Sequence, residues 1–430
     1  MSTNTVIQID REPDYPAVLD AYRRHLSRGR AKISEVFGTQ LEVSARGAWV
    51  ETSDGGSYLN AGGYGVFIHG ARHPHVESAV IRQIQTNPIA SRILLEPQAA
   101  RAAEALARST PDGLEHVHFA CSGTEATEAA IKLARTCGRR RLVSTTRGYH
   151  GKTLGSLSVT ANPLYQDPFR PLLPDVSHVP FGDAAALAAE LRTGPEACVI
   201  LEPVQGEGGV IIPPDGYLRE VRAICDQYGA IFVLDEIQTG LGRLGTWWGA
   251  DREGVTPDIL LVGKGLSGGI VPVSAIVATA EIFGAFNKDP FIHTSTFSGA
   301  PIAMAAARAA IEAIESDGLV ERSASIGARL LAGMREITRL RCPHLVKDVR
   351  GVGLLIGVEA EDPGVAGELL AELMDQHVIV NYSLNASTVL RFTPPAVMSD
   401  DDREFLLSAY DAACVEVSAR YPIATTVGVG

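Results

Sequence analysis

Two stretches decide the fold: AIFVLDEIQTG at residues 230–240 and ILLVGKGLSGG at residues 259–269. Each begins with an apolar run of strand length, and each run is followed by a charged residue, Asp235 in the first and Lys264 in the second. Continuous apolar runs predict strands that are buried on both faces, as in a parallel sheet. About one strand–helix–strand unit separates Asp235 from Lys264, so we expect both side chains at the same carboxyl edge, where open α/β sheets bind ligands.

The same alternation of apolar runs with helical stretches extends over residues 75–310 and predicts an α/β fold with a mostly parallel sheet. The candidate strands are residues 116–120, 141–145, 197–204, 230–237, 259–264 and 274–279. The candidate helices include residues 124–135, 217–229 and 301–315.

The two ends of the chain differ from this pattern. Residues 41–60 predict a small, turn-rich meander, and residues 316–430 predict a smaller α+β domain with one long helix. We therefore expect a large domain at residues 66–315, a small domain at residues 316–430, and an N-terminal segment, residues 1–65, that contributes to the small domain.

Composition excludes several classes of partner. The 430 residues carry 38 Lys+Arg against 50 Asp+Glu, a formal net charge of −12, so the chain repels nucleic acid and anionic membrane surfaces. The six cysteines are scattered, which fits a reducing compartment, and the start MSTNTVIQIDREPD has no signal pattern. We expect a cytoplasmic protein. Its hydrophobic content of 46% is enough for a large core and a subunit interface.

Asp235 and Lys264 each admit two interpretations. A buried carboxylate is costly unless a cation or donors meet it, so Asp235 needs a partner; otherwise it only caps the loop after its strand. Desolvation lowers the pKa of a buried lysine and suits Lys264 to act as an amine nucleophile. The alternative is a surface lysine whose charged end reaches the solvent.

A further candidate is the segment from Cys121 to Ala126, which precedes a predicted helix with glycine and small hydroxyls. Such a helix start predicts a phosphate cup, and the alternative is a plain helix cap.

Two other patterns resemble functional motifs but do not match them. Gly151-Lys152-Thr153 lacks the first glycine of a P-loop, and GVGLLIG at 351–357 has the wrong glycine spacing for a dinucleotide site and is typical of a strand. The histidine pairs at 73/75 and 116/118 have no third ligand nearby, so we expect no metal.

Together these motifs resemble the class III pyridoxal-phosphate aminotransferases, which have the fold-type I architecture. The similarity is greatest to the branch that uses putrescine, ornithine or acetylornithine, and it covers about residues 40–415. The motifs that carry it are SGTEA (122–126), GYHGKTLG (148–155), LEPVQGEGGV (201–210), LDEIQTGLGRLG (234–245), PDILLVGKGLSGG (257–269), HTSTFSG (293–299) and LRFTPP (390–395).

The resemblance implies that pyridoxal 5′-phosphate is the cofactor, and it assigns roles to residues. Lys264 matches the lysine that forms a Schiff base with the cofactor, and Asp235 matches the acid that keeps the pyridine nitrogen protonated. The remaining matches are Ser122, Gly123 and Thr124 in the phosphate cup, Tyr149 on the cofactor face, Gln238 at the phenolic oxygen, Glu202 behind the site and Thr296 reaching the phosphate from the neighbouring subunit. The last match implies a homodimer with its active site at the subunit interface.

For the substrate, the resemblance points to Arg391 and Glu207. In related enzymes the arginine binds the carboxylate of a 2-oxo acid, and the glutamate masks it when an ω-amine enters; the alternative is a permanent salt bridge. Tyr64 matches an aromatic residue at the substrate mouth. Cys121, Ser298 and Ala300 depart from the residues common at these positions, which points to a specialised biosynthetic substrate.

We therefore expect an aminotransferase (transaminase) that moves a terminal amino group from a diamine or ω-amino acid to 2-oxoglutarate or pyruvate. The alternatives are an ornithine- or acetylornithine-type aminotransferase, and an aminomutase or decarboxylase on the same fold. Two further classes are disfavoured. Having both Lys264 and Asp235 argues against a binding protein that has lost its cofactor, and the missing glycine fingerprint argues against a nucleotide-dependent oxidoreductase.

Overall fold

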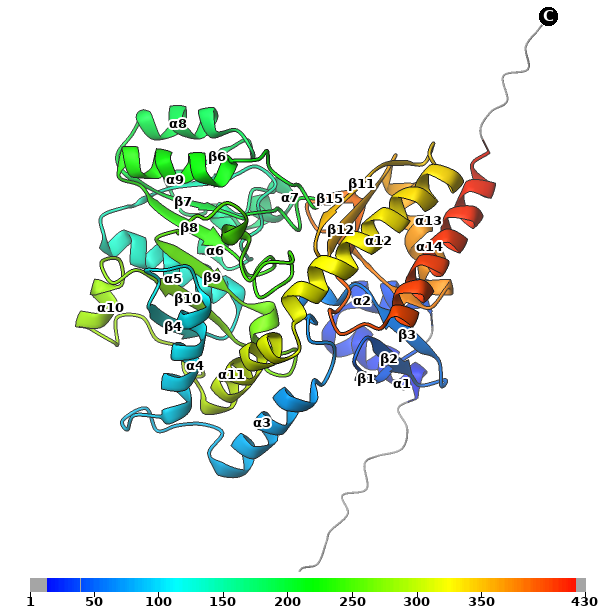
Figure 1. Ribbon diagram of the computed structural model, residues 1–430, viewed down its shortest axis with the longest axis horizontal. Helices are drawn as coiled ribbons and strands as arrows, with labels where there is room; N and C mark the ends of the chain where they lie inside the picture. The colour runs from blue at the N-terminus through cyan, green and yellow to red at the C-terminus, as the bar shows by residue number, and fades with distance from the viewer. Residues whose placement is uncertain (1–13, 39, 423–430) are drawn as a thin grey trace, which may run out of the picture.

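The computed structural model describes residues 14–38 and 40–422 of the chain. Residues 1–13 and 423–430, which include the start used above to judge targeting and the outer ends of two predicted domain segments, lie outside the described residues. Figure 1 shows one body built around a large sheet and, beside it, a second body to which the first and last parts of the chain both contribute. The division of the chain at residues 65 and 315 stays a prediction.

A seven-stranded sheet forms the centre of the larger body. Its strands, in spatial order, are β4 (His116–Ala120), β10 (Ser274–Ala278), β9 (Ile259–Val262), β8 (Ile231–Asp235), β7 (Ala197–Leu201), β5 (Arg141–Thr145) and β6 (Val176–Val179). Neighbours from β9 to β6 run parallel, and β10 runs antiparallel to both β9 and β4. The expected α/β fold with a mostly parallel sheet is confirmed, and all six predicted strands are present. The edge strand β6 was not predicted.

Helices cover both faces of this sheet (Figure 1). In β8, Ile231 and Val233 pack with α5 (Gly123–Thr136), whereas Phe232 and Leu234 pack into the core of the opposite face. This burial on both sides explains why the strands are continuously apolar. The other helices of this body are α3 (Pro74–Thr86), α4 (Pro97–Ser109), α6 (Leu154–Val159), α7 (Pro163–Gln166), α8 (Ala184–Arg192), α9 (Tyr217–Tyr228), α10 (Gly284–Lys288) and α11 (Pro301–Ser316).

The second body contains two small sheets. The predicted meander is present as β1 (Glu42–Arg46), β2 (Trp49–Thr52) and β3 (Ser57–Asn60), and β13 (Val378–Ile379) from the far end of the chain pairs with β3 in parallel. The other sheet is antiparallel, in the order β11 (Val346–Val352), β12 (Leu355–Ala360), β15 (Ala386–Phe392) and β14 (Asn381–Ser383). GVGLLIG at 351–357 therefore spans the turn of the β11–β12 hairpin instead of forming one strand.

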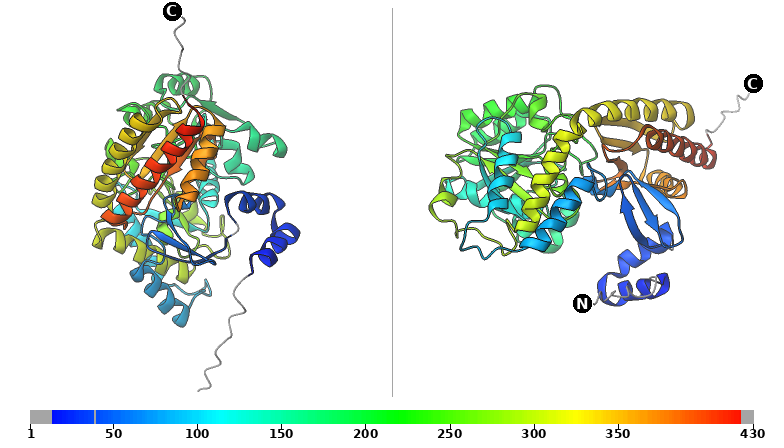
Figure 2. Two further views of the ribbon diagram at one scale, coloured as in Figure 1. Left: turned by 90° about the vertical axis from the view of Figure 1, so that its right-hand side faces the viewer. Right: turned by 60° about the horizontal axis from the view of Figure 1, so that its bottom comes forward.

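Three long helices pack with these sheets: α12 (Leu319–Arg341), α13 (Pro363–Asp375) and α14 (Asp400–Arg420). The first helices, α1 (Tyr15–Ala21) and α2 (Arg28–Phe37), extend outward beyond β1–β3, as the right-hand view of Figure 2 shows. None of the helices in the described part of the chain combines the length and the apolar character needed to cross a bilayer.

Candidate active site

A cavity of about 370 Å³ opens at the carboxyl ends of the sheet strands. Each of β4, β5, β7, β8 and β9 is followed by a loop or helix start that contributes to its wall, because parallel strands end at the same edge. The lining residues are Gly123, Thr124, Tyr149, His150, Gly151, Lys152, Glu202, Glu207, Asp235, Ile237, Gln238 and Lys264. Asp235 and Lys264 thus meet in one cavity, as the sequence predicts.

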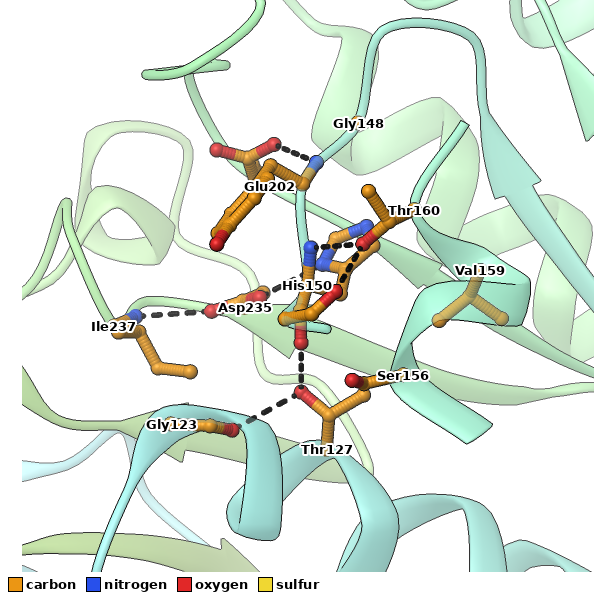
Figure 3. A network of polar contacts seen from close by, with 12 residues as sticks. Gly123, Thr127, Gly148, His150, Ser156, Val159, Thr160, Glu202, Asp235 and Ile237 are labelled. Carbon is orange, nitrogen blue, oxygen red and sulfur yellow. Dashed lines mark hydrogen bonds and ion pairs between the residues drawn. The ribbon is translucent and has the colours of Figure 1, made fainter. Parts of the chain in front are cut away.

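The buried carboxylate of Asp235 has a partner that the sequence analysis did not identify. His150 Nδ1 lies 2.7 Å from Asp235 Oδ2, and the backbone N–H of Ile237 donates to Oδ1 at 3.1 Å (Figure 3). Burial alone would lower the pKa of His150, but the hydrogen bond to Asp235 and the charges of Asp235 and Glu202 outweigh it and raise this pKa. Asp235 is therefore held in one orientation, facing the cavity.

Hydrogen bonds to the backbone of His150 fix the position of this residue. The His150 N–H donates to Thr160 Oγ1 at 2.8 Å, and its carbonyl accepts from Thr127 Oγ1 at 2.8 Å (Figure 3). Thr160 Oγ1 also donates to the carbonyl of Gly151 at 2.9 Å. These bonds tie the loop after β5 to α5 and to the end of α6, so the ring that supports Asp235 belongs to a rigid part of the structure.

Glu202 lies behind the cavity and is almost fully buried. Its carboxylate accepts hydrogen bonds from the backbone N–H groups of Tyr149 at 3.1 Å and Gly206 at 3.0 Å. Burial raises the pKa of Glu202 to about 7, against the opposing effect of His150. Through these two hydrogen bonds Glu202 fixes the loop that carries Tyr149.

Lys264 follows β9 and lies deep in the structure, with part of its side chain open to the cavity. Its φ of 43° is in the left-handed region, a conformation that costs a non-glycine residue free energy and is often found at functional sites. Desolvation lowers the pKa of Lys264 to about 8, although the charge of Glu207 acts in the opposite direction. The unprotonated, nucleophilic form of this amine is therefore much more populated near neutral pH than in an ordinary lysine.

The start of α5 and the loop around Gly151 form the floor of the cavity. Gly123 and Thr124 line it, and the Thr124 hydroxyl lies 2.6 Å from that of Ser156. A Cβ on Gly151, where φ is 117°, would lie 2.5 Å from Thr124 Oγ1, so only glycine permits this close approach. Ser122 caps α5 through its side chain and is not among the lining residues.

Gln238 lines the cavity with its amide buried. Neither its amide oxygen nor its amide nitrogen has a hydrogen-bond partner among the described residues. Buried polar groups are nearly always hydrogen-bonded, so an unpaired amide on a residue that lines a cavity points to a ligand that supplies the partner.

Glu207 and Arg391 form a buried ion pair at the side of the cavity. Their closest atoms, Glu207 Oε1 and Arg391 Nη1, are 2.5 Å apart, and the side chains are 7% and 1% exposed. Burial alone would raise the pKa of Glu207, but the charges of Arg391 and Lys264 lower it. Glu207 lines the cavity and Arg391 does not, so the glutamate stands between the arginine and the cavity.

Besides Ser122 and Arg391, two further predicted site residues do not line this cavity. Tyr64 is 56% exposed and lines a different cavity, formed with α1, α2 and β1. Thr296 is exposed and does not line the cavity of its own chain. Their predicted roles, at the substrate mouth and at the phosphate of a neighbouring subunit, stay predictions.

Comparison with known proteins identifies the family. A family model for class-III aminotransferases matches residues 36–413. The chain belongs to the class-III aminotransferases. Members of this family are aminotransferases that depend on pyridoxal phosphate, and a structure of the Toxoplasma gondii ornithine aminotransferase contains this cofactor at partial occupancy.

Solved structures of other aminotransferases share the fold of this class-III aminotransferase. The ornithine aminotransferase of Toxoplasma gondii ME49 has a TM-score of 0.88 and 27% identity, over 95% of this chain and 96% of that one. A transaminase from the marine bacterium Virgibacillus has a TM-score of 0.87 and 27% identity, over 94% and 100%. An (S)-enantioselective omega-transaminase from Thermomicrobium roseum has a TM-score of 0.86 and 29% identity, over 95% and 100%.

The cavity of this class-III aminotransferase fits pyridoxal phosphate. It offers an amine of lowered pKa, an oriented carboxylate, a helix start with small residues and an amide without a partner. These are the kinds of group that would be needed to hold the aldehyde, the pyridine nitrogen, the phosphate and the phenolic oxygen of the cofactor. In the described residues, no group of three or more His, Cys, Asp or Glu side chains is placed to bind a metal ion.

Sequence reasoning missed four lining residues, His150, Gly151, Lys152 and Ile237, of which His150 and Lys152 have polar side chains. His150 lies inside the GYHGKTLG motif, and the requirement that Asp235 have a partner could have directed attention to it. Lys152 was set aside with the incomplete P-loop pattern, although it lines the cavity and its amine lies 3.6 Å from the centre of the Tyr165 ring.

The lowered pKa of Lys264 predicts how the cofactor-free protein takes up pyridoxal phosphate. Because only the unprotonated amine reacts, the uptake rate should rise about tenfold per pH unit well below pH 8 and level off above it. The absorbance of the yellow Schiff base between Lys264 and the cofactor measures this rate. Lys264→Ala should stay colourless and inactive, whereas Lys288→Ala, on the exposed end of α10, should match the wild type. A rate that does not depend on pH would contradict the assignment.

Proposed function

We propose that this class-III aminotransferase moves a terminal amino group from a diamine or ω-amino acid to a 2-oxo acid, within a specialised biosynthetic reaction in the cytoplasm. The observation that carries the proposal is the position of Glu207, which pairs with Arg391 and shields it from the cavity. A cavity with a masked cation accepts a chain end that has an amine and no carboxylate. The same cavity with Arg391 uncovered accepts a carboxylate.

The reaction needs both states in turn. While the amine donor is bound, Glu207 neutralises Arg391, and an uncompensated buried guanidinium would otherwise cost about 3–5 kcal/mol. When the 2-oxo acid binds, its carboxylate replaces that of Glu207, so Arg391 remains paired throughout. The Nε of Arg391 has no hydrogen-bond partner among the described residues, so it remains available to a carboxylate that binds with two oxygens.

When bound, pyridoxal phosphate supplies an electrophilic carbon and a ring that accepts electrons. We propose that the Lys264 amine, as the free base, would be the group that takes up and gives back the proton that moves in the reaction. Asp235, oriented by His150, holds a positive charge at the ring nitrogen. Gln238 would contact the phenolic oxygen, the start of α5 would hold the phosphate, and Tyr149 would supply an aromatic ring for the cofactor.

The comparisons support a terminal amine as the donor, because the matching structures include an ornithine aminotransferase and omega-transaminases. Within this class, the putrescine-, ornithine- and acetylornithine-type assignments differ only in what lies beyond the reacting amine. An aminomutase on the same fold is the second candidate, and it would show no requirement for a 2-oxo acid.

A donor panel tests the proposal. Diamines, ornithine, acetylornithine, 4-aminobutyrate and lysine are each supplied with 2-oxoglutarate and with pyruvate, and products are analysed by mass spectrometry. At least one terminal amine should give turnover that depends on the 2-oxo acid. Turnover restricted to α-amino groups would reject the donor assignment, and turnover without a 2-oxo acid would favour the aminomutase.

Lys152 favours a dicarboxylic acceptor over pyruvate. Lys152 lines the same cavity as Glu207, and its ammonium group packs on the ring of Tyr165, so the residue can supply a second cation in addition to Arg391. A 2-oxo acid with a second carboxylate, such as 2-oxoglutarate, would use both cations, whereas pyruvate would use one.

Lys152→Met keeps the length of the side chain and removes its charge. We expect the kcat/KM for 2-oxoglutarate to fall about tenfold or more, in keeping with the loss of one hydrogen-bonded charge pair, while the value for pyruvate changes less than about threefold. Steady-state kinetics with one fixed amine donor measures both values. An equal loss for the two acceptors would mean that Lys152 acts on the cofactor or the fold.

We propose a homodimer in which Thr296 completes the partner's site. Supporting this, the segment at 89–95 and the loop at 291–297 expose large apolar side chains, among them Leu95, which is fully exposed, and Phe291 at 79%. The two segments are neighbours, since Arg92 Nη2 donates to the carbonyl of Ser298 at 2.5 Å. Clustered apolar exposure of this extent is typical of an interface.

Mixing two variants tests the sharing of sites. Thr296→Ala should weaken cofactor retention at low cofactor concentration, and Lys264→Ala should be inactive. If subunits re-associate at random, mixed dimers combine one intact Lys264 with the partner's intact Thr296, and about a quarter of the wild-type activity should return. No recovery, with re-association verified by mass spectrometry, would mean that Thr296 does not act across the interface.

A further inference from the structure

The turn of the β14–β15 hairpin, residues 383–386, lies against Glu207. We call these residues the hairpin tip. The Leu384 N–H donates to Glu207 Oε2 at 2.8 Å, and the Asn385 N–H donates to the Glu207 carbonyl at 2.9 Å. The other carboxylate oxygen, Oε1, pairs with Arg391 on β15. One hairpin therefore holds both oxygens of Glu207, through a charged side chain on its strand and a backbone donor at its tip.

The hairpin tip is itself attached to the larger body by Asn385. Its side-chain nitrogen donates to the carbonyls of Arg147 at 2.9 Å and Gly148 at 3.2 Å, and its side-chain oxygen accepts from Asn162 at 2.8 Å. Gly148 directly precedes Tyr149, which lines the cavity. The tip therefore has a fixed position relative to the cavity.

Further contacts link the tip to the acceptor side of the cavity. The Tyr165 hydroxyl donates to the carbonyl of Leu384 at 3.1 Å, and the amine of Lys152 lies over the Tyr165 ring. The Ser383 hydroxyl donates to the carbonyl of Gly206, the residue before Glu207, at 3.3 Å. The tip thus contacts the backbone on both sides of the Glu207 side chain and the group proposed to bind a second carboxylate.

These contacts have a consequence for the exchange of Glu207 and substrate on Arg391. Glu207 can leave Arg391 only if Oε2 also leaves the Leu384 N–H, or if the tip moves with the carboxylate. A hydrogen bond to a charged acceptor is among the stronger ones in proteins, and breaking it leaves a partly buried donor without a partner. The position of Glu207 is therefore set by two partners, and only one of them is the arginine.

We propose that the hairpin tip is a specificity-determining element: the Leu384 N–H holds Glu207 over Arg391 and so sets the balance between amine donors and carboxylate-bearing acceptors. This inference rests on the proposed exchange of Glu207 on Arg391. A tip that held Glu207 more weakly would favour binding of the 2-oxo acid, and a tip that held it more strongly would favour the amine. Asn385 is a positioning residue that keeps the tip in place.

Leu384→Pro tests this directly because it removes the N–H. Proline is favoured at the first central position of a β-turn, which Leu384 occupies between Ser383 and Ala386, and neither Leu384 nor Asn385 has a positive φ. Leu384→Ala is the matched control, since it shortens a side chain that is 37% exposed and keeps the N–H. The measured quantity is the dissociation constant of glutarate, an unreactive dicarboxylate, by calorimetry on the holoenzyme.

We expect glutarate to bind Leu384→Pro about tenfold more tightly than wild type, because one anchor of Glu207 is lost. Leu384→Ala should bind within about twofold of wild type. In a Glu207→Ala background, where the N–H has no carboxylate to hold, adding Leu384→Pro should not change the affinity. Equal affinities in Leu384→Pro and Leu384→Ala, or the same gain in the Glu207→Ala background, would overturn the proposal.

If Leu384→Pro does not fold, Asn385→Ala replaces it. Loss of the bonds to Arg147 and Gly148 should loosen the tip and tighten glutarate binding by about threefold, and unchanged binding would overturn the proposal. The donor panel and the glutarate affinity test two different proposals. Tighter glutarate binding without any terminal-amine turnover would reject the proposed donor and keep the role of the tip. Terminal-amine turnover with unchanged glutarate binding would reject only the role of the tip.

Discussion

A carboxylate buried at the end of an apolar strand cannot remain without a partner, and the active site of this aminotransferase is arranged around that constraint. Asp235 ends β8 in the middle of the sheet, where both faces are covered. His150 provides the partner at 2.7 Å and is itself held by bonds from α5 and the end of α6. The hydrogen bonds from the protein thereby offset the desolvation free energy of the buried carboxylate. The carboxylate is left in an orientation that suits a positively charged ring nitrogen.

The parts that follow from local sequence patterns could be predicted. Strand length, continuous apolar character and the charged residues at the strand ends led to the sheet, and six strands lie where the patterns placed them. The convergence of Asp235 and Lys264 follows because parallel strands end at one edge. The strand β6 was missed because VSHV is short, has polar residues at its two central positions and lies at the edge of the sheet, where burial imposes a weaker pattern.

The parts that depend on long-range packing could not be predicted from the residues alone. Nothing local distinguishes His150 as the partner of a carboxylate 85 positions later, and nothing in the sequence near Leu384 indicates that its N–H reaches Glu207. Tyr64 illustrates the limit of a family resemblance. The motif gives its position in the chain, but the cavity that it lines in this structure also depends on α1 and α2.

The charges in the cavity account for the use of one site by two substrates. The cofactor phosphate and the 2-oxo acid are both negatively charged. The start of α5, Lys152 and Arg391 provide the positive charge that complements them. With a cationic amine bound instead, the same cations would be unfavourable. Glu207 removes one of these conflicts by neutralising the buried guanidinium of Arg391. Whether the site favours a cationic amine or an anionic 2-oxo acid therefore depends on the position of the Glu207 carboxylate. The groups that hold this carboxylate also control which substrate binds.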